Sequence, residues 1–132
     1  ITEAVAIRRT LAETRPDAHL PDLAMSLNNL AVHLGNLKHH EEVLQTITEA
    51  VAIRRTLAET RPDAHLPDLA MSLNNLAVHL GNLKHHEEAL AVITEATHHY
   101  RKLAETHPSV FQGDVERCER VLEWLHRRDD TK

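Results

Sequence analysis

The sequence predicts an all-α protein built as a stack of antiparallel helix pairs, and three observations support this. Residues 1–46 occur again at 47–92 with three of 46 positions changed, Val43 against Ala89, Gln45 against Ala91 and Thr46 against Val92. Apolar residues recur three and four residues apart, and no segment alternates with period two. A repeat of this length is typical of a stacked array, in which each unit covers the apolar face of the next. We therefore expect one all-α domain of about six helices over residues 1–132.

A half repeat comes before the first complete helix pair. Residues 1–15 carry an apolar face with the spacing of one helix, and Pro16 is expected to end that helix. The helix pair at 21–61 then begins near Pro21, because a proline fits the first turn of a helix, where its missing N–H is harmless. The helix pair at 67–106 repeats the same pattern.

Within each pair a turn has to reverse the chain. Gly35 and Asn36 offer the backbone freedom that commonly ends a helix. We therefore expect a turn between Gly35 and His39, and the second copy of the repeat predicts the same turn after Gly81.

The last residues predict a cap that closes the stack. A capping helix is expected within 109–128, most clearly from Asp114 to Arg128, with a narrow apolar stripe made of Val115, Cys118, Leu122 and Leu125. The aromatic residues all lie in this divergent part, at Tyr100, Phe111 and Trp124. Their position suits a last unit that has no neighbour to cover it. The alternative is that Trp124 anchors a partner.

The composition is that of an ordinary globular protein and argues against several function classes. The formal net charge is -5, whereas nucleic-acid binding needs Lys and Arg clustered on one face. The two Arg pairs, Arg8-Arg9 and Arg54-Arg55, are each followed by a Glu and are expected to form a solvated, ion-paired helix face. No apolar run approaches the ~20 residues of a bilayer span, and no signal peptide is recognised, so we expect a cytoplasmic protein without membrane contact.

Each copy contains a pattern that identifies a helical repeat. The run LNNLAVHLGNLKHHEEALAVITEA occupies 73–96, and its near-copy occupies 27–50. In its first helix, a Leu is followed three residues later by another Leu and then by a small residue: Leu73, Leu76 and Ala77, and Leu27, Leu30 and Ala31. This pattern resembles tetratricopeptide repeats, in particular the longer variety of kinesin light chains and many bacterial signalling proteins. The resemblance covers nearly all of residues 1–108 and implies a right-handed α-solenoid of antiparallel helix pairs.

Two features depart from that family. The repeat of 46 residues is longer than the family's. The Gly that the family often has at the turn inside each pair is replaced by Lys38 and Lys84. Without that Gly, the two helices of a pair could run on as one and exchange halves between chains, which would give a domain-swapped dimer.

The resemblance also implies a binding groove. In the family, the first helices of successive pairs line a concave groove that binds a peptide. The residues at the matching positions are Asn28, Asn29, Val32, Asn36, Asn74, Asn75, Val78 and Asn82. An Asn amide both donates and accepts hydrogen bonds, so a row of Asn side chains can bind a peptide main chain. The alternative is that one Asn of each adjacent pair satisfies neighbouring backbone instead.

The twelve histidines do not form a metal motif within one helix. The adjacent histidines at 39–40, 85–86 and 98–99 point away from each other, whereas zinc on a helix needs ligands three or four residues apart. The run HHEE differs from the HExxH motif, and Cys118 lies on an apolar stripe, where a thiol is usually inert. We expect no enzyme activity, no cofactor and no metal. Metal sites shared between chains and a histidine-driven pH response stay open as alternatives.

The sequence thus predicts a non-catalytic protein-interaction scaffold that binds a peptide or partner segment. The alternative is a structural or self-assembling unit, natural or engineered, because near-identical copies and an uncovered first helix permit end stacking or helix exchange.

Overall fold

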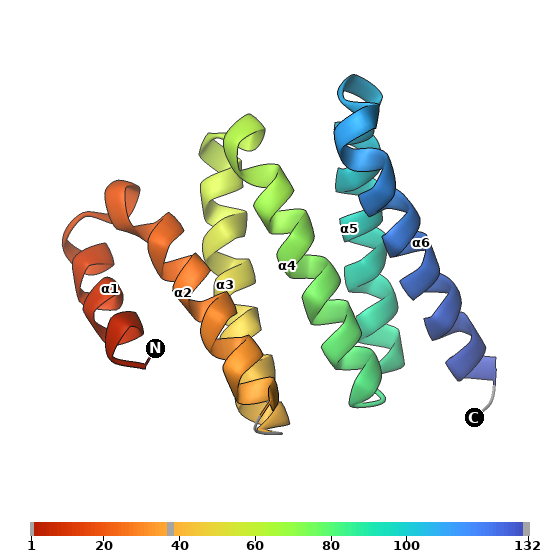
Figure 1. Ribbon diagram of the computed structural model, residues 1–132, viewed down its shortest axis with the longest axis horizontal. Coiled ribbons are helices and arrows are strands. Elements are labelled where there is room, and N and C mark those ends of the chain that lie inside the picture. The colour runs from red at the N-terminus through yellow and green to blue at the C-terminus, as the bar shows by residue number, and fades with distance from the viewer. Residues whose placement is uncertain (1, 37–38, 131–132) are drawn as a thin grey trace. The chain divides into compact units, whose positions relative to one another are not determined.

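The computed structural model describes residues 2–36 and 39–130, and within these ranges the chain forms six α-helices and no strand (Figure 1). The predicted all-α fold class and the helix number are confirmed. The chain divides into two compact units, Ile1–His65 and Leu66–Lys132, which are described separately below.

The first unit contains α1 (Thr2–Thr14), α2 (Pro16–Asn36) and α3 (His40–Thr60), and α2 packs against both other helices. Successive helices run in opposite directions (Figure 1). The core is formed by one apolar stripe from each helix, with Val5, Ala12, Leu23, Leu27 and Ala50 buried and Leu20, Leu30 and Ile53 packed against them. The small residues Ala12 and Ala50 allow the helices to approach closely.

The second unit contains nearly all of α4 (Pro62–Asn82), with α5 (His86–Thr106) and α6 (Pro108–Asp130). Fully buried side chains come from all three helices and include Leu73, Ile93, Cys118 and Leu125. The rings of Tyr100 and Phe111 lie 6.4 Å apart between their centroids. The last helix, α6, packs against α5 and begins at Pro108, before Asp114.

The helices begin earlier than the sequence analysis predicted. The structure starts α2, α4 and α6 at Pro16, Pro62 and Pro108, so the segment 17–20 is helical, and Pro21 and Pro67 lie inside helices.

Single-residue links between helices explain the early starts. The N–H of Arg61 donates to the Leu57 carbonyl oxygen (3.0 Å), and the Arg61 carbonyl oxygen accepts from His65 N–H (3.1 Å). Arg61 therefore makes both the last backbone hydrogen bond of α3 and the first one of α4. Pro62, which follows it, occupies the first helical position, where no N–H is needed.

The turn inside the second helix pair uses a different residue from the one predicted. Gly81 stays within α4, and the left-handed backbone conformation falls on Lys84, with φ of 67°. The N–H of His85 donates to the Leu80 carbonyl oxygen (2.9 Å), which closes the turn before α5. The helices of this pair therefore do not run on as one.

The first pair makes the same turn bond, from His39 N–H to the Leu34 carbonyl oxygen (3.0 Å), and α2 and α3 are separate helices. Lys38 lies outside the described residues.

The solvated face predicted for the Arg pairs forms only in part, because Arg9 and Arg55 are exposed whereas Arg8 is half-buried. Arg54 is buried, with 5% of its surface exposed. Arg8 crosses from α1 to α2, where its Nη1 donates to Ser26 Oγ (2.8 Å). Arg9 forms an ion pair with Glu49 on α3 rather than with the following Glu of its own helix. Arg8, Arg9 and Arg54 therefore join helices of the first unit.

Among the described residues, no helix combines the length and the apolar character needed to cross a membrane.

Candidate functional site

Adjacent asparagines of α4 have separate roles in the second unit. Asn74 is buried, and its Oδ1 accepts a hydrogen bond from the Cys118 thiol on α6 (3.7 Å). Asn75 is exposed, because neighbouring residues on a helix point about 100° apart. Asn74 thus helps to hold α6 on α4, which leaves Asn75 as the member of the pair that faces solvent.

The first unit repeats this division of roles with a different partner. When the amide of Asn28 is oriented with its oxygen towards Arg54, that oxygen accepts from Arg54 Nη2 at 3.1 Å. Arg54 lies on α3, so Asn28 joins the two helices of its pair, while Asn29 and Val32 are exposed. The side chain of Asn36 lies outside the described residues.

The other two predicted residues of α4 lie in a hollow. Val78 and Asn82 form one wall, and the opposite wall comes from α6; the lining residues are Val78, Asn82, Arg117, Arg120, Val121 and Trp124. The hollow measures about 250 Å³ and is a shallow depression that is widely open to solvent. Val78 is half-buried and Asn82 is exposed, so a ligand can reach both.

Sequence reasoning missed the α6 wall of this hollow as a site. Arg117, Arg120, Val121 and Trp124 are three, four and seven residues apart, so they share one face of the helix. That spacing could have predicted a shared, partly apolar and partly cationic face on this helix. The cap interpretation directed attention to the buried stripe of Val115, Cys118 and Leu125 instead, and left only Trp124 as a candidate anchor.

Gly81 brings the two walls together. A Cβ atom at this position would lie 2.6 Å from Cζ3 of Trp124 and 2.8 Å from Cδ2 of Leu125, both closer than such atoms approach. The absence of a side chain at Gly81 lets α6 lie close to α4, with the indole ring over the glycine. Trp124 therefore belongs to the packing of the cap and to the lining of the hollow at once.

The hollow has a positive rim in an acidic protein. Arg117 forms an ion pair with Asp114, one helical turn before it. Arg120 is exposed and has no carboxylate within 4 Å among the described residues. Glu119 contacts Arg101 of α5 at 4.0 Å and does not line the hollow. Two cations of α6, Arg117 and Arg120, therefore line the hollow beside its apolar wall.

Two buried groups of the second unit are held in their neutral forms. Burial, followed by the nearby charge of Asp114, raises the pKa of Tyr100 from 10.0 to about 12. Burial also raises the pKa of the Cys118 thiol above its ordinary value. A protonated, buried thiol is a poor nucleophile.

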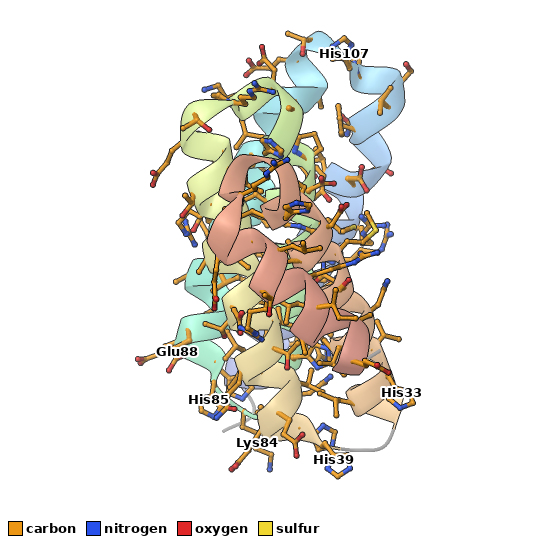
Figure 2. The ribbon with its side chains drawn as sticks, turned by 90° about the vertical axis from the view of Figure 1, so that its left-hand side faces the viewer. His33, His39, Lys84, His85, Glu88 and His107 are labelled. Carbon is orange, nitrogen blue, oxygen red and sulfur yellow. The ribbon has the colours of Figure 1, made fainter. Side chains whose placement is uncertain are left out.

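Three of the described histidines, at 39, 85 and 99, each lie within 4 Å of one Glu that is three or four residues away. Nδ1 of His85 lies 3.8 Å from Oε1 of Glu88, and Figure 2 shows both side chains beside Lys84 at the turn end of the second unit. In the first unit, Nδ1 of His39 lies 3.6 Å from Oε1 of Glu42. Groups of three or more His, Cys, Asp or Glu that could hold a metal ion are absent from the described part of the chain.

Comparison with known proteins does not place the chain in a family. No protein-family model matches the sequence, and no curated protein matches it.

Proposed function

We propose that this protein is a non-catalytic interaction module of the tetratricopeptide type, and that it binds a peptide segment of a partner in the hollow between α4 and α6. The main support for the proposal is that Val78 and Asn82 of α4 line the same hollow as Trp124 of α6. An apolar surface beside an amide suits a peptide, because one side chain can be buried while the amide bonds the main chain.

The size of the hollow supports a peptide side chain over a small molecule as the occupant. Its volume of about 250 Å³ is below the roughly 300 to 1,000 Å³ typical of small-molecule sites. The aromatic wall favours an apolar side chain, since Trp residues supply large contact areas at interfaces.

The experiment uses Trp124, the one tryptophan of the chain, as a reporter. Peptides selected from a random display library against the full chain are expected to shift the indole cross-peak of Trp124 in an NMR titration. Val78→Gln puts a polar side chain into the hollow without changing the charge, and should weaken binding by roughly tenfold.

Val32→Gln is the matched control, because Val32 occupies the same position in the other copy of the repeat. It should leave the affinity unchanged. Equal losses in the two variants, or peptides that bind without moving the indole signal, would show that the site is elsewhere.

A second candidate function is self-association through α1. Ile7 and Leu11 of α1 are 55% and 40% exposed, whereas Leu57, which corresponds to Leu11 in the second copy, is only 8% exposed. An apolar face on an end helix favours contact with another chain. Light scattering during size-exclusion chromatography tests this: the double variant Ile7→Glu, Leu11→Glu should abolish any oligomer, and a parent protein that is monomeric at high concentration would refute it.

A further inference from the structure

The charges around the α4/α6 hollow specify what kind of peptide it fits. Arg117 and Arg120 stand one turn apart on α6, and Val121 and Trp124 continue the same face. A guanidinium group binds carboxylates through paired hydrogen bonds. A ligand that matches this wall carries one apolar side chain for Trp124, with carboxylates beside it.

Asp114 already supplies one such carboxylate from within the protein. Its Oδ1 pairs with Nη2 of Arg117, and Asp114 is itself outside the lining of the hollow. A ligand carboxylate that approaches Arg117 must therefore compete with Asp114. Arg120 offers its guanidinium group without such a competitor among the described residues.

We propose that the hollow binds an acidic peptide segment with a central apolar residue, that Arg120 is its main carboxylate contact, and that Asp114 limits the affinity by occupying Arg117. This inference rests on the proposed peptide-binding function and adds the chemistry of the partner. Glu119 does not line the hollow and contacts Arg101 of α5. Glu116 and Glu123, also exposed on α6, do not line the hollow either, but they stand one turn from Arg120 and reduce its positive potential.

The probes are three capped peptides, each with a central Leu flanked on both sides by two Glu, two Gln or two Lys residues. Each is titrated into the full chain at low salt while the indole cross-peak of Trp124 is followed. The Glu peptide should bind most tightly and the Lys peptide least. Added sodium chloride should weaken the Glu peptide far more than the Gln peptide, because salt screens exposed charges.

Three variants test the residue assignments. Arg120→Gln should weaken the Glu peptide by roughly two- to fivefold, the range for one exposed ion pair, and leave the Gln peptide unchanged. Asp114→Asn should instead strengthen the Glu peptide, because Arg117 is released. Arg127→Gln is the control for net charge, since Arg127 is exposed on the same helix but does not line the hollow.

The outcomes distinguish a failure of the acidic-peptide inference from a failure of the proposed peptide-binding function. If none of the three peptides, and no peptide from the library, moves the Trp124 signal, the peptide-binding function itself is wrong. If peptides bind but the Gln or Lys peptide binds as tightly as the Glu peptide, the function stands and the acidic partner is refuted. Weaker binding of the Glu peptide to Asp114→Asn, with helical content retained by circular dichroism, would refute the competitor role.

Discussion

The repeat places identical residues in different environments, which separates the effect of environment from that of sequence. His86 begins α5 and is 6% exposed, and its Nδ1 has no hydrogen-bond partner among the described residues. His40 is the matching residue of the first copy; it begins α3 and is exposed. An unsatisfied buried nitrogen costs free energy, whereas an exposed nitrogen bonds to water.

We expect His86→Leu to raise the free energy of unfolding by about 1 kcal/mol, because the substitution removes the buried polar atom and keeps a side chain of similar volume. His40→Leu should change it by less than about 0.5 kcal/mol, as is usual for a surface substitution. Urea denaturation of the two variants measures both values. A loss of stability in His86→Leu would mean that the ring makes a favourable bond, for example through an ordered water.

The same comparison shows what the sequence could not reveal at single residues. The sequence alone does not distinguish Asn28 from Asn29, or Asn74 from Asn75, because each pair consists of two adjacent asparagines. Which of them bonds to another helix depends on where Arg54 and Cys118 lie in the packed structure. The alternative that one Asn of each pair is structural could be stated in advance, but the choice needed the packed structure.

At the scale of whole elements, the sequence predicted helix type and order well and helix starts poorly. Apolar spacing sets which face of a helix is buried, and the 46-residue copies made that spacing unambiguous. The predicted start of α4 was wrong because Pro62 and Pro67 both fit the first turn of a helix. The structure shows that α4 begins at Pro62, directly after the single linking residue Arg61. The α6 wall of the hollow was missed because it faces a helix about 40 residues earlier in the chain.

The contact between α4 and α6 gives a prediction for glycine. Gly81→Ala should lower the free energy of unfolding by about 1 to 2 kcal/mol, because the added methyl group meets Trp124 and the buried Leu125 and the overpacking outweighs the gain in helix propensity. Thermal or urea unfolding followed by tryptophan fluorescence measures the change.

Gly113→Ala is the matched control on α6, where an added Cβ meets no atom within 4 Å. It should raise the stability by up to about 1 kcal/mol, since alanine is the better helix former. Equal effects of the two substitutions would show that α6 does not lie as close to α4 as described.

At the scale of the whole molecule, the two compact units differ in how well they are closed. The first unit leaves Ile7 and Leu11 of its end helix exposed, whereas the second is covered by the cap helix α6. Apolar side chains that stay in contact with water add little to stability, so we expect the first unit to be the less stable of the two.

We therefore expect the first unit to unfold before the second. In a urea titration, the far-ultraviolet circular dichroism signal, which follows all six helices, should begin to fall before the fluorescence of Trp124 changes. Superimposable curves would mean that the chain unfolds as one cooperative block.

The aromatic cap has a consequence for every spectroscopic study of this protein. Tyr100, Phe111 and Trp124 are its aromatic residues, and all of them lie in the second unit. Near-ultraviolet absorbance and intrinsic fluorescence therefore report on that half alone. A sample whose first unit has unfolded, or has been cut by a protease, would keep the near-ultraviolet absorbance and fluorescence of the second unit, so the state of the first unit has to be followed by a label or by backbone signals.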